Sequence, residues 1–134
     1  MADKKIPSEA EHLFDETNFA HVSTVNEDGS PQTSPVWVTR DNGHIVFNTA
    51  KGRVKPRNIE RDDRVSLSIH SQENPYENVL VQGRAEMDEE GADENIDALA
   101  KKYLGKDEYP LRQPGEERVI VRVTPEKVSY TPPS

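Results

Sequence analysis

Residues 19–48 read FAHVSTVNEDGSPQTSPVWVTRDNGHIVFN, and their pattern predicts an antiparallel sheet. Three segments rich in strand-forming residues, 19–25, 32–39 and 44–48, are separated by NEDG at 26–29 and by DNG at 41–43. Glycine, asparagine and aspartate accept the positive φ angles that tight hairpin turns require. We therefore expect three consecutive antiparallel strands that form a meander.

Three further strands are expected downstream. Residues 64–70 show the clearest pattern, because three aliphatic residues alternate there with polar ones, which indicates a strand with one buried face. Residues 79–85 predict a fifth strand, and residues 118–130 predict a sixth that is broken near Pro125. The sheet is therefore expected to have six strands.

Helical signals lie near both ends of this sheet region. Ser8 and Glu11 have the capping-box spacing, which predicts a short helix at the N-terminus. Apolar residues at helical spacing predict a second helix over 89–104, and Gly105 is expected to end it. Residues 109–115 contain two prolines and are expected to form a loop.

These segments together predict a mainly β (α+β) protein, a six-stranded antiparallel barrel with accessory helices. We expect one domain over residues 1–134, with loose tails at 1–7 and 131–134, because no linker or internal repeat divides the chain. The length of 134 residues supports one core. A hydrophobic fraction of 32% and a mean hydropathy of -0.90 are low, so we expect a second subunit to cover part of the apolar surface.

Charge and composition exclude several classes of function. The net charge of -8 makes nucleic acid an improbable partner, because the molecule as a whole repels phosphate backbones. The absence of cysteine excludes disulfides, thiolate metal sites and cysteine nucleophiles. The N-terminus has no apolar leader, and no run approaches the roughly 20 apolar residues of a membrane span, so we expect a soluble, cytoplasmic protein with no membrane contact.

One basic segment stands out in this acidic chain. Residues 48–61 read NTAKGRVKPRNIER and follow an apolar strand, so a strand, a glycine turn and a helix start are expected there. Unpaired N–H groups and the helix dipole make such a turn a binding place for an anion. Arg53 and Lys55 are the first candidates, and the bound group could belong to a nucleotide, a flavin or pyridoxal phosphate. A solvated helix face is the alternative.

Pro56 affects where this helix is expected to begin. A proline disfavours helical geometry at the residue before it, which here is Lys55. We therefore expect the helix to begin later than Lys55, with the proline in its first turn.

Trp37 is the only tryptophan, and it follows Pro35 within a predicted strand. A proline removes one donor from the ladder and marks an edge or a bulge, so neighbouring backbone groups are free to meet a planar ring with its own donors and acceptors. The alternative is that Trp37 packs in the core.

Other kinds of site find little support. The four histidines have no metal-ligand spacing, and the acidic residues of 86–97 lack the EF-hand pattern, so no metal site is expected. The nucleophile elbow of serine hydrolases and the G-x-G-x-x-G dinucleotide fingerprint are both absent. No catalytic residue is identified from these patterns.

The order of motifs resembles the split β-barrel oxidoreductases related to pyridoxamine 5′-phosphate oxidase, and within them the branch that uses the deazaflavin coenzyme F420. The resemblance covers about residues 14–130 and rests on FAHVSTV at 19–25, DGSP at 28–31, SPVW at 34–37, FNT at 47–49, GRVKPRN at 52–58, RDDRV at 61–65, VQG at 81–83 and RVIVRVTP at 118–125.

The resemblance implies an FMN-binding split-barrel fold and a homodimer with two cofactor sites at its interface, each lined by both chains. Arg53 and Lys55 match the positions that hold the cofactor phosphate, with Arg57 and Asn58 nearby. The strand beside the ring is matched by Ser34, Val36 and Trp37, the end of the next strand by Thr49, and an aromatic residue from the partner by Tyr76.

The activity implied is hydride transfer between coenzyme F420 and an unsaturated small-molecule substrate. The substrate pocket is expected to be assembled from two chains, with a contribution from the loop at 109–115. Two alternatives stay open at this point. The same fold could bind FMN and act as an oxidase or flavin reductase, or it could be a non-catalytic protein that carries a cofactor or a tetrapyrrole.

Overall fold

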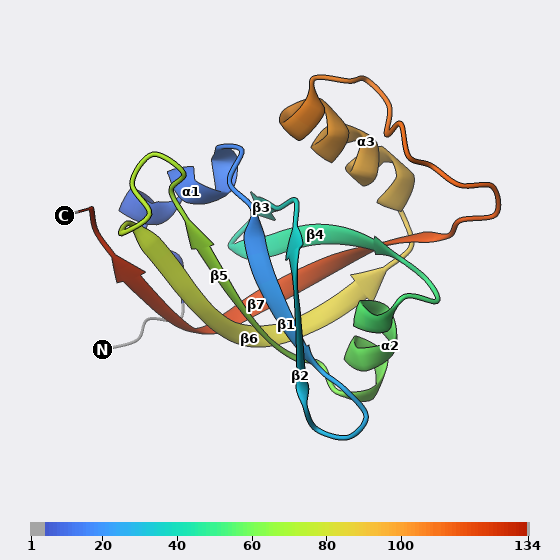
Figure 1. The fold of residues 1–134 in the computed structure, drawn as a ribbon, viewed down its shortest axis with the longest axis horizontal. Helices are drawn as coiled ribbons and strands as arrows, with labels where there is room; N and C mark the ends of the chain where they lie inside the picture. Colours follow the sequence, from blue (N-terminus) through green and yellow to red (C-terminus); the bar gives the residue numbers. More distant parts are fainter. Residues whose placement is uncertain (1–4, 134) are drawn as a thin grey trace.

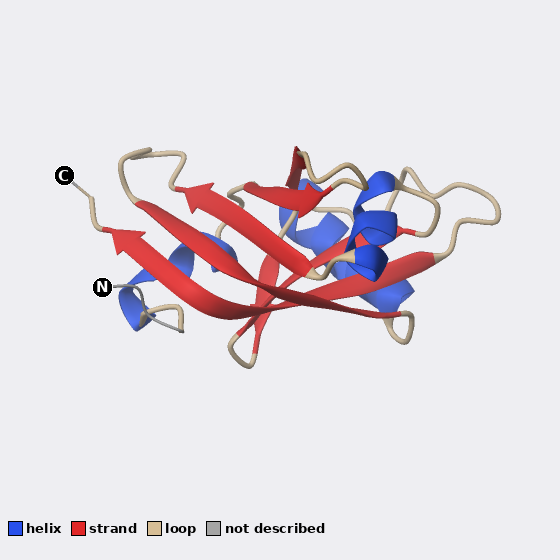
Figure 2. Ribbon diagram, turned by 90° about the horizontal axis from the view of Figure 1, so that it is seen from below, coloured by secondary structure: helices blue, strands red, loops and turns tan. Residues whose placement is uncertain are grey.

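The computed structural model describes residues 5–133, and it contains one antiparallel sheet of seven strands. The order across the sheet is β2-β1-β5-β6-β7-β4-β3 (Figures 1 and 2). The strands are β1 (Ala20–Val25), β2 (Pro31–Val36), β3 (Thr39–Asp41), β4 (His44–Ala50), β5 (Arg64–His70), β6 (Asn78–Asp88) and β7 (Arg118–Thr131). The helices are the 3-10 turn η1 (Ser8–Ala10), α1 (His12–Asp15), α2 (Val54–Arg61) and α3 (Ala92–Leu104).

The two edge strands of the sheet are neighbours in the sequence. β2 lies at one end of the strand order and β3 at the other, yet only Trp37 and Val38 separate them along the chain. The sheet must therefore roll until its edges approach each other, which gives the barrel that Figure 1 shows. The mainly β class and the antiparallel barrel are confirmed.

The predicted meander is wrong in its middle strand. Residues 32–39 do not form one strand between two neighbours, because β2 pairs with β1 and the separate strand β3 pairs with β4. The chain crosses from one sheet edge to the other at Trp37, and this crossing accounts for seven strands instead of six. Both predicted hairpin turns are present at the expected places.

The core fills the inside of the barrel. Alternation along β5 buries Val65, Leu67 and Ile69, as the sequence pattern predicts, and these side chains belong to the same cluster as Phe14 and Phe47. Burial of these side chains supplies the main stabilisation of the fold, at roughly 1.5–3 kcal/mol for each large apolar side chain.

β7 continues through the predicted break as a bulge. Its pairing with β6 shifts between Gln82 and Gly83, so that Gln82 faces Lys127 and Gly83 faces Pro125. A Cβ atom on Gly83 would lie 2.3 Å from the carbonyl oxygen of Thr124, so only glycine fits this close approach. The proline is tolerated because the ladder between β4 and β7 ends before it.

Three expectations about helices and tails are corrected. The N-terminal helix is present, but the capping box is not, since no side chain among residues 5–133 caps η1 or α1. α2 begins at Val54, before Pro56, and Lys55 is helical. The predicted tails are too long, because Ile6 packs against the core and Thr131 pairs with Asn78; residues 1–4 and 134 of these tails lie outside the described residues.

α3 ends as predicted, with Gly105 at a φ of 71° in the left-handed region. Within residues 5–133, none of the helices combines the length and the apolar character that a membrane crossing needs.

Candidate functional site

The connection from β4 to α2 forms the cationic end of the site. β4 ends at Ala50, Gly52 turns the chain at a φ of 90°, and Arg53 is the N-cap of α2. Within residues 5–133 no side chain caps this helix, so the N–H groups at its first turn lack a capping partner there. Pro56 is the third residue of α2, where a backbone N–H would have no helical partner in any case, which explains why the helix can begin before it.

A cavity of about 230 Å³ lies beside this turn. This open cavity is bordered by the end of β2, the end of β4, the start of α2, one face of α3 and the segment that leads into β7. The residues that line it are Phe19, Pro35, Val36, Trp37, Asn48, Thr49, Arg53, Lys55, Ile96, Leu99, Tyr109, Leu111 and Arg118. Five residues expected from the sequence therefore meet here: Val36, Trp37, Thr49, Arg53 and Lys55.

Lys55 is half-buried at the edge of this cavity. Its Nζ donates a hydrogen bond to Ser34 Oγ at 2.7 Å, which brings the sixth expected residue to the site. In the described part of the chain, Lys55 forms no ion pair with a carboxylate. Burial and the nearby charge of Arg53 lower the pKa of Lys55. An ammonium in such a place is stabilised by any anion that binds next to it.

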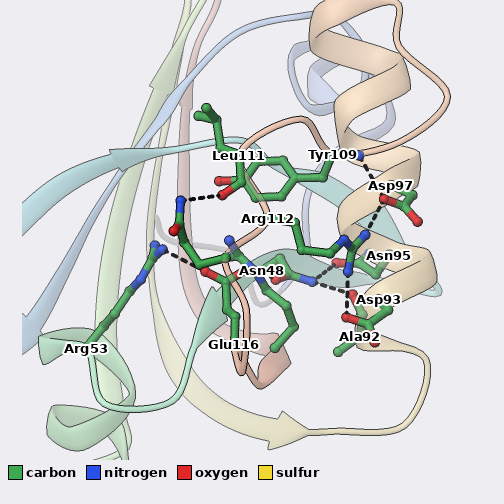
Figure 3. Close-up of polar contacts among 12 residues, drawn as sticks. Asn48, Arg53, Ala92, Asp93, Asn95, Asp97, Tyr109, Leu111, Arg112 and Glu116 are labelled. Atoms are coloured by element: carbon green, nitrogen blue, oxygen red, sulfur yellow. Dashed lines mark hydrogen bonds and ion pairs between the residues drawn. The ribbon is translucent and has the colours of Figure 1, made fainter.

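Two arginines share one carboxylate at the other side of the cavity. Arg118 Nε lies 2.8 Å from Glu116 Oε1, and Arg53 Nη2 lies 3.5 Å from Glu116 Oε2 (Figure 3 shows Arg53 and Glu116). The side chains of Arg118 and Glu116 are only 3% and 8% exposed. With Lys55, the site carries three cationic groups against one carboxylate, so it has a net positive charge.

Two buried polar atoms at the cavity lining have no hydrogen-bond partner within residues 5–133. They are Thr49 Oγ1 and Arg118 Nη2. Buried polar groups in folded proteins are usually paired, so unpaired ones next to a cavity indicate that a bound molecule or water completes them. These atoms, together with the ammonium of Lys55, which has no carboxylate partner within residues 5–133, fit a ligand that has both an anionic group and ring oxygens or nitrogens.

Aromatic rings form the wall opposite the cationic end. Trp37 stacks on Tyr103 with ring centroids 5.4 Å apart and an interplanar angle of 8°, while Tyr109 meets Trp37 edge-on at 6.0 Å. The guanidinium carbon of Arg118 lies 4.7 Å from the centre of the Tyr109 ring. Trp37 is half-buried and lines the cavity. Its position favours the hypothesis that it contacts a ligand over the alternative that it only packs in the core.

Three other expected residues lie away from the cavity of this chain. Arg57 is exposed on α2. Asn58 is buried beneath the helix, where its Nδ2 donates to Thr24 Oγ1 and Asn26 Oδ1 and its Oδ1 accepts from Arg61, so its amide ties α2 to β1. Tyr76 is 72% exposed in the turn between β5 and β6. The role expected for Tyr76 lies in the cofactor site of the partner subunit and not in the cavity of its own chain.

The sequence did not identify Glu116 and Arg118 as site residues. The only local signal is that two glutamates and an arginine stand directly before an apolar strand. The register that places Arg118 opposite Ala50, at the end of β4, comes from the sheet and is invisible in the sequence alone. The expectation that residues 109–115 contribute to the pocket agrees with the positions of Tyr109 and Leu111.

Two other features of the described residues bear on the choice of site. Residues 5–133 contain no cluster of three or more potential metal-ligating side chains. A larger groove of about 460 Å³ lies on the outer face of the sheet, lined by side chains such as His21, Ser66 and Lys127. It lacks the concentration of positive charge and the aromatic wall that distinguish the smaller cavity.

Fold and site together define a split-barrel protein with a cationic turn between β4 and α2. The sequence profile described as pyridoxamine 5′-phosphate oxidase matches residues 6–132, and the chain belongs to this family. No protein with a curated description matches the sequence.

Solved structures agree with this assignment. An F420 reductase is 28% identical, with a TM-score of 0.80, over 92% of this chain and 98% of that one. A putative pyridoxamine 5′-phosphate oxidase from Lactobacillus delbrueckii is 27% identical, with a TM-score of 0.68, over 95% of both chains. A conserved hypothetical protein from Mycobacterium tuberculosis is 24% identical, with a TM-score of 0.74, over 96% of this chain and 87% of that one, and it supports the fold alone.

Proposed function

We propose that this protein is an oxidoreductase that binds coenzyme F420 and transfers a hydride between it and an unsaturated small-molecule substrate. The observation that carries this proposal is Lys55, a half-buried ammonium that has a hydroxyl partner but no carboxylate and lies beside a cavity with an aromatic wall. The similarity to an F420 reductase supports the choice of cofactor.

The residues present fit a phosphorylated planar cofactor. Lys55 and Arg53 would hold its phosphate, because charge-assisted hydrogen bonds to phosphate oxygens are among the stronger polar interactions in proteins. Arg118 and Thr49 have donors to spare for other polar atoms of the ligand. A bound deazaflavin would supply the hydride chemistry, and the protein would bind and orient it and exclude water with the rings of Trp37 and Tyr109.

The proposal includes a homodimer. The cavity of about 230 Å³ is below the ~300–1,000 Å³ of typical cofactor and drug sites. A second chain would enlarge and close it, and the exposed Tyr76 would supply an aromatic side chain from the partner. Light scattering of the purified protein tests this part, and a monomer at working concentration would contradict it.

A fluorescence titration with F420, and in parallel with FMN, tests the proposed cofactor. Lys55→Ala and Arg53→Ala should each weaken binding by more than about 1 kcal/mol, and Lys55 should matter more because it is less exposed and lacks a carboxylate partner. Lys101→Ala is the matched control, since Lys101 is an exposed lysine whose nearest carboxylate is 4.0 Å away. Unchanged affinity in both site variants would refute the phosphate assignment.

FMN is the second candidate cofactor. The family itself and the 27% identity with the putative oxidase from Lactobacillus delbrueckii favour it. Preference for FMN in the parallel titration would support an oxidase or flavin reductase. Tight binding without turnover by any hydride source would instead support a carrier of a cofactor or a tetrapyrrole.

A further inference from the structure

The segment between α3 and β7 passes along the mouth of the cavity. It runs from Gly105 to Glu117 without regular secondary structure, and it contributes Tyr109 and Leu111 to the lining. Figure 1 shows it as the long orange loop that leaves the end of α3 and returns to β7. Such a segment needs side-chain contacts to hold a fixed position, because no ladder or helix supports it.

Asp97 supplies the central contact. Its Oδ1 accepts a hydrogen bond from the backbone N–H of Tyr109 at 2.8 Å and another from Arg112 Nη2 at 2.6 Å (Figure 3). Arg112 Nη1 also donates to Asp93 Oδ1 at 3.0 Å, one helical turn earlier on α3. One carboxylate thus holds the loop at two points, and one of these is the backbone of the residue whose ring lines the cavity.

α3 also takes part in the cavity wall. Ile96 and Leu99, on either side of Asp97 in the sequence, line the cavity. The helix therefore presents apolar side chains to the cavity while it anchors the loop through Asp97. The position of Tyr109 relative to Trp37 follows from this arrangement.

The surface that Tyr109 offers is suited to a ring. Its ring is perpendicular to that of Trp37 and lies over the guanidinium of Arg118, which pairs with Glu116. Phe19, Leu111 and Ile96 extend this surface with apolar groups. A flat apolar ring gains contact with these aromatic and aliphatic side chains.

We propose that Asp97 is a positioning residue that fixes Tyr109 as one wall of a slot for a planar apolar ring. This inference rests on the proposed function in that it assigns the aromatic end of the same cavity. The ring could belong to the cofactor or to the acceptor molecule, and the two sources are separated below.

The first test needs no cofactor. Trp37 is the only tryptophan, so quenching of its fluorescence by acrylamide reports whether Tyr109 still covers it. Asp97→Ala should raise the quenching constant, and Asp97→Asn should lie closer to the wild type because its amide oxygen still accepts from the Tyr109 N–H. Glu94→Gln, an exposed change on the same helix, is the control.

The second test uses 2-naphthol as a neutral planar probe. Binding of 2-naphthol is measured by energy transfer from Trp37. Asp97→Ala should weaken this binding by at least about fivefold, which is the effect of one lost positioning contact. A folded Asp97→Ala protein with unchanged quenching and unchanged 2-naphthol affinity would overturn the proposal. An equal effect of Glu94→Gln would overturn it as well.

Repeating the 2-naphthol titration with protein saturated with F420 or FMN identifies the source of the ring. Displacement of 2-naphthol assigns the slot to the cofactor ring, and simultaneous binding assigns it to the acceptor. The loss in Asp97→Ala is expected in either case. If neither F420 nor FMN binds, the proposed function fails, while the quenching and 2-naphthol measurements still decide the role of Asp97.

Discussion

Lys55 at the start of α2 and Lys102 near the end of α3 are both half-buried, but their surroundings differ. Lys102 Nζ donates to the carbonyl oxygens of Phe14 and Val38, and Asp15 is near. Burial lowers the pKa of Lys102 to about 8. Among the residues that the structure describes, Lys55 Nζ has only the hydroxyl of Ser34 as a hydrogen-bond acceptor. The comparison teaches that burial of a lysine does not by itself mark a binding site. A buried ammonium whose hydrogen-bonding capacity is largely unused does.

The largest effect is expected from Lys102. Lys102→Met leaves the buried carbonyl of Phe14 without its donor and removes one of two donors from Val38. We expect the free energy of unfolding to fall by about 2 kcal/mol, measured by urea denaturation. Ligand affinity should stay within about twofold of the wild type, since Lys102 does not line the cavity. A Lys102→Met variant as stable as the wild type would contradict the structural role of Lys102 and remove the contrast with Lys55.

Lys55 should show the opposite pattern. Lys55→Met removes an ammonium that costs desolvation and has no carboxylate partner, so stability should change by less than about 0.5 kcal/mol. Affinity for a phosphorylated cofactor should fall about tenfold, which corresponds to about 1.4 kcal/mol. Urea denaturation and the fluorescence titration measure the two quantities on one preparation. A large loss of stability would place Lys55 with Lys102 among the structural lysines.

The pH dependence of binding sharpens the contrast. An anion binds the protonated Lys55, whose pKa in the free protein lies below the ordinary 10.5. Affinity for the anionic ligand is therefore highest below this lowered pKa and falls as the pH rises through it. Lys55→Arg stays charged over the same range, so its affinity should remain flat from about pH 7 to about pH 10. Parallel curves for the wild type and this variant would show that Lys55 does not titrate against the ligand.

The smallest effect is expected at Asp15, the acidic neighbour of Lys102. Asp15 accepts two hydrogen bonds from Arg40, at 2.8 Å and 2.9 Å, and these bonds are the main reason that its pKa is lowered. The pair is exposed, so Asp15→Asn should cost about 0.5 kcal/mol or less. A loss as large as that of Lys102→Met would mean that Lys102 depends on its carboxylate neighbour and not on the two carbonyls.

Local patterns in the sequence were sufficient for most of the fold. Alternation at Val65, Leu67 and Ile69 identified β5, the Asp-Gly and Asn-Gly turns identified both hairpins, and Gly105 marked the end of α3. The division of residues 32–39 into two strands could not be found this way. It depends on the closure of the barrel, which is a property of the whole sheet and leaves no periodic signal at Trp37 and Val38.

The site shows the same division between local and long-range information. The chemistry of Arg53, Lys55 and Gly52 is contained in one short segment, so the sequence located the cationic turn. Glu116 and Arg118 come from the other end of the chain and reach Arg53 through the pairing of β4 with β7. Asn58 was expected near the ligand because of its position in the motif, but its amide is used by Thr24 and Asn26.

Val38 shows how the barrel is closed at the crossing between its edges. Its N–H donates to the hydroxyl of Tyr103 at 3.1 Å, and its carbonyl accepts from Lys102 and Tyr103, so both backbone groups are paired with side chains of α3 and not with a strand. The exchange of this amide proton with solvent deuterium therefore requires only that α3 detach. Its protection factor gives the free energy of that local opening, separate from global unfolding.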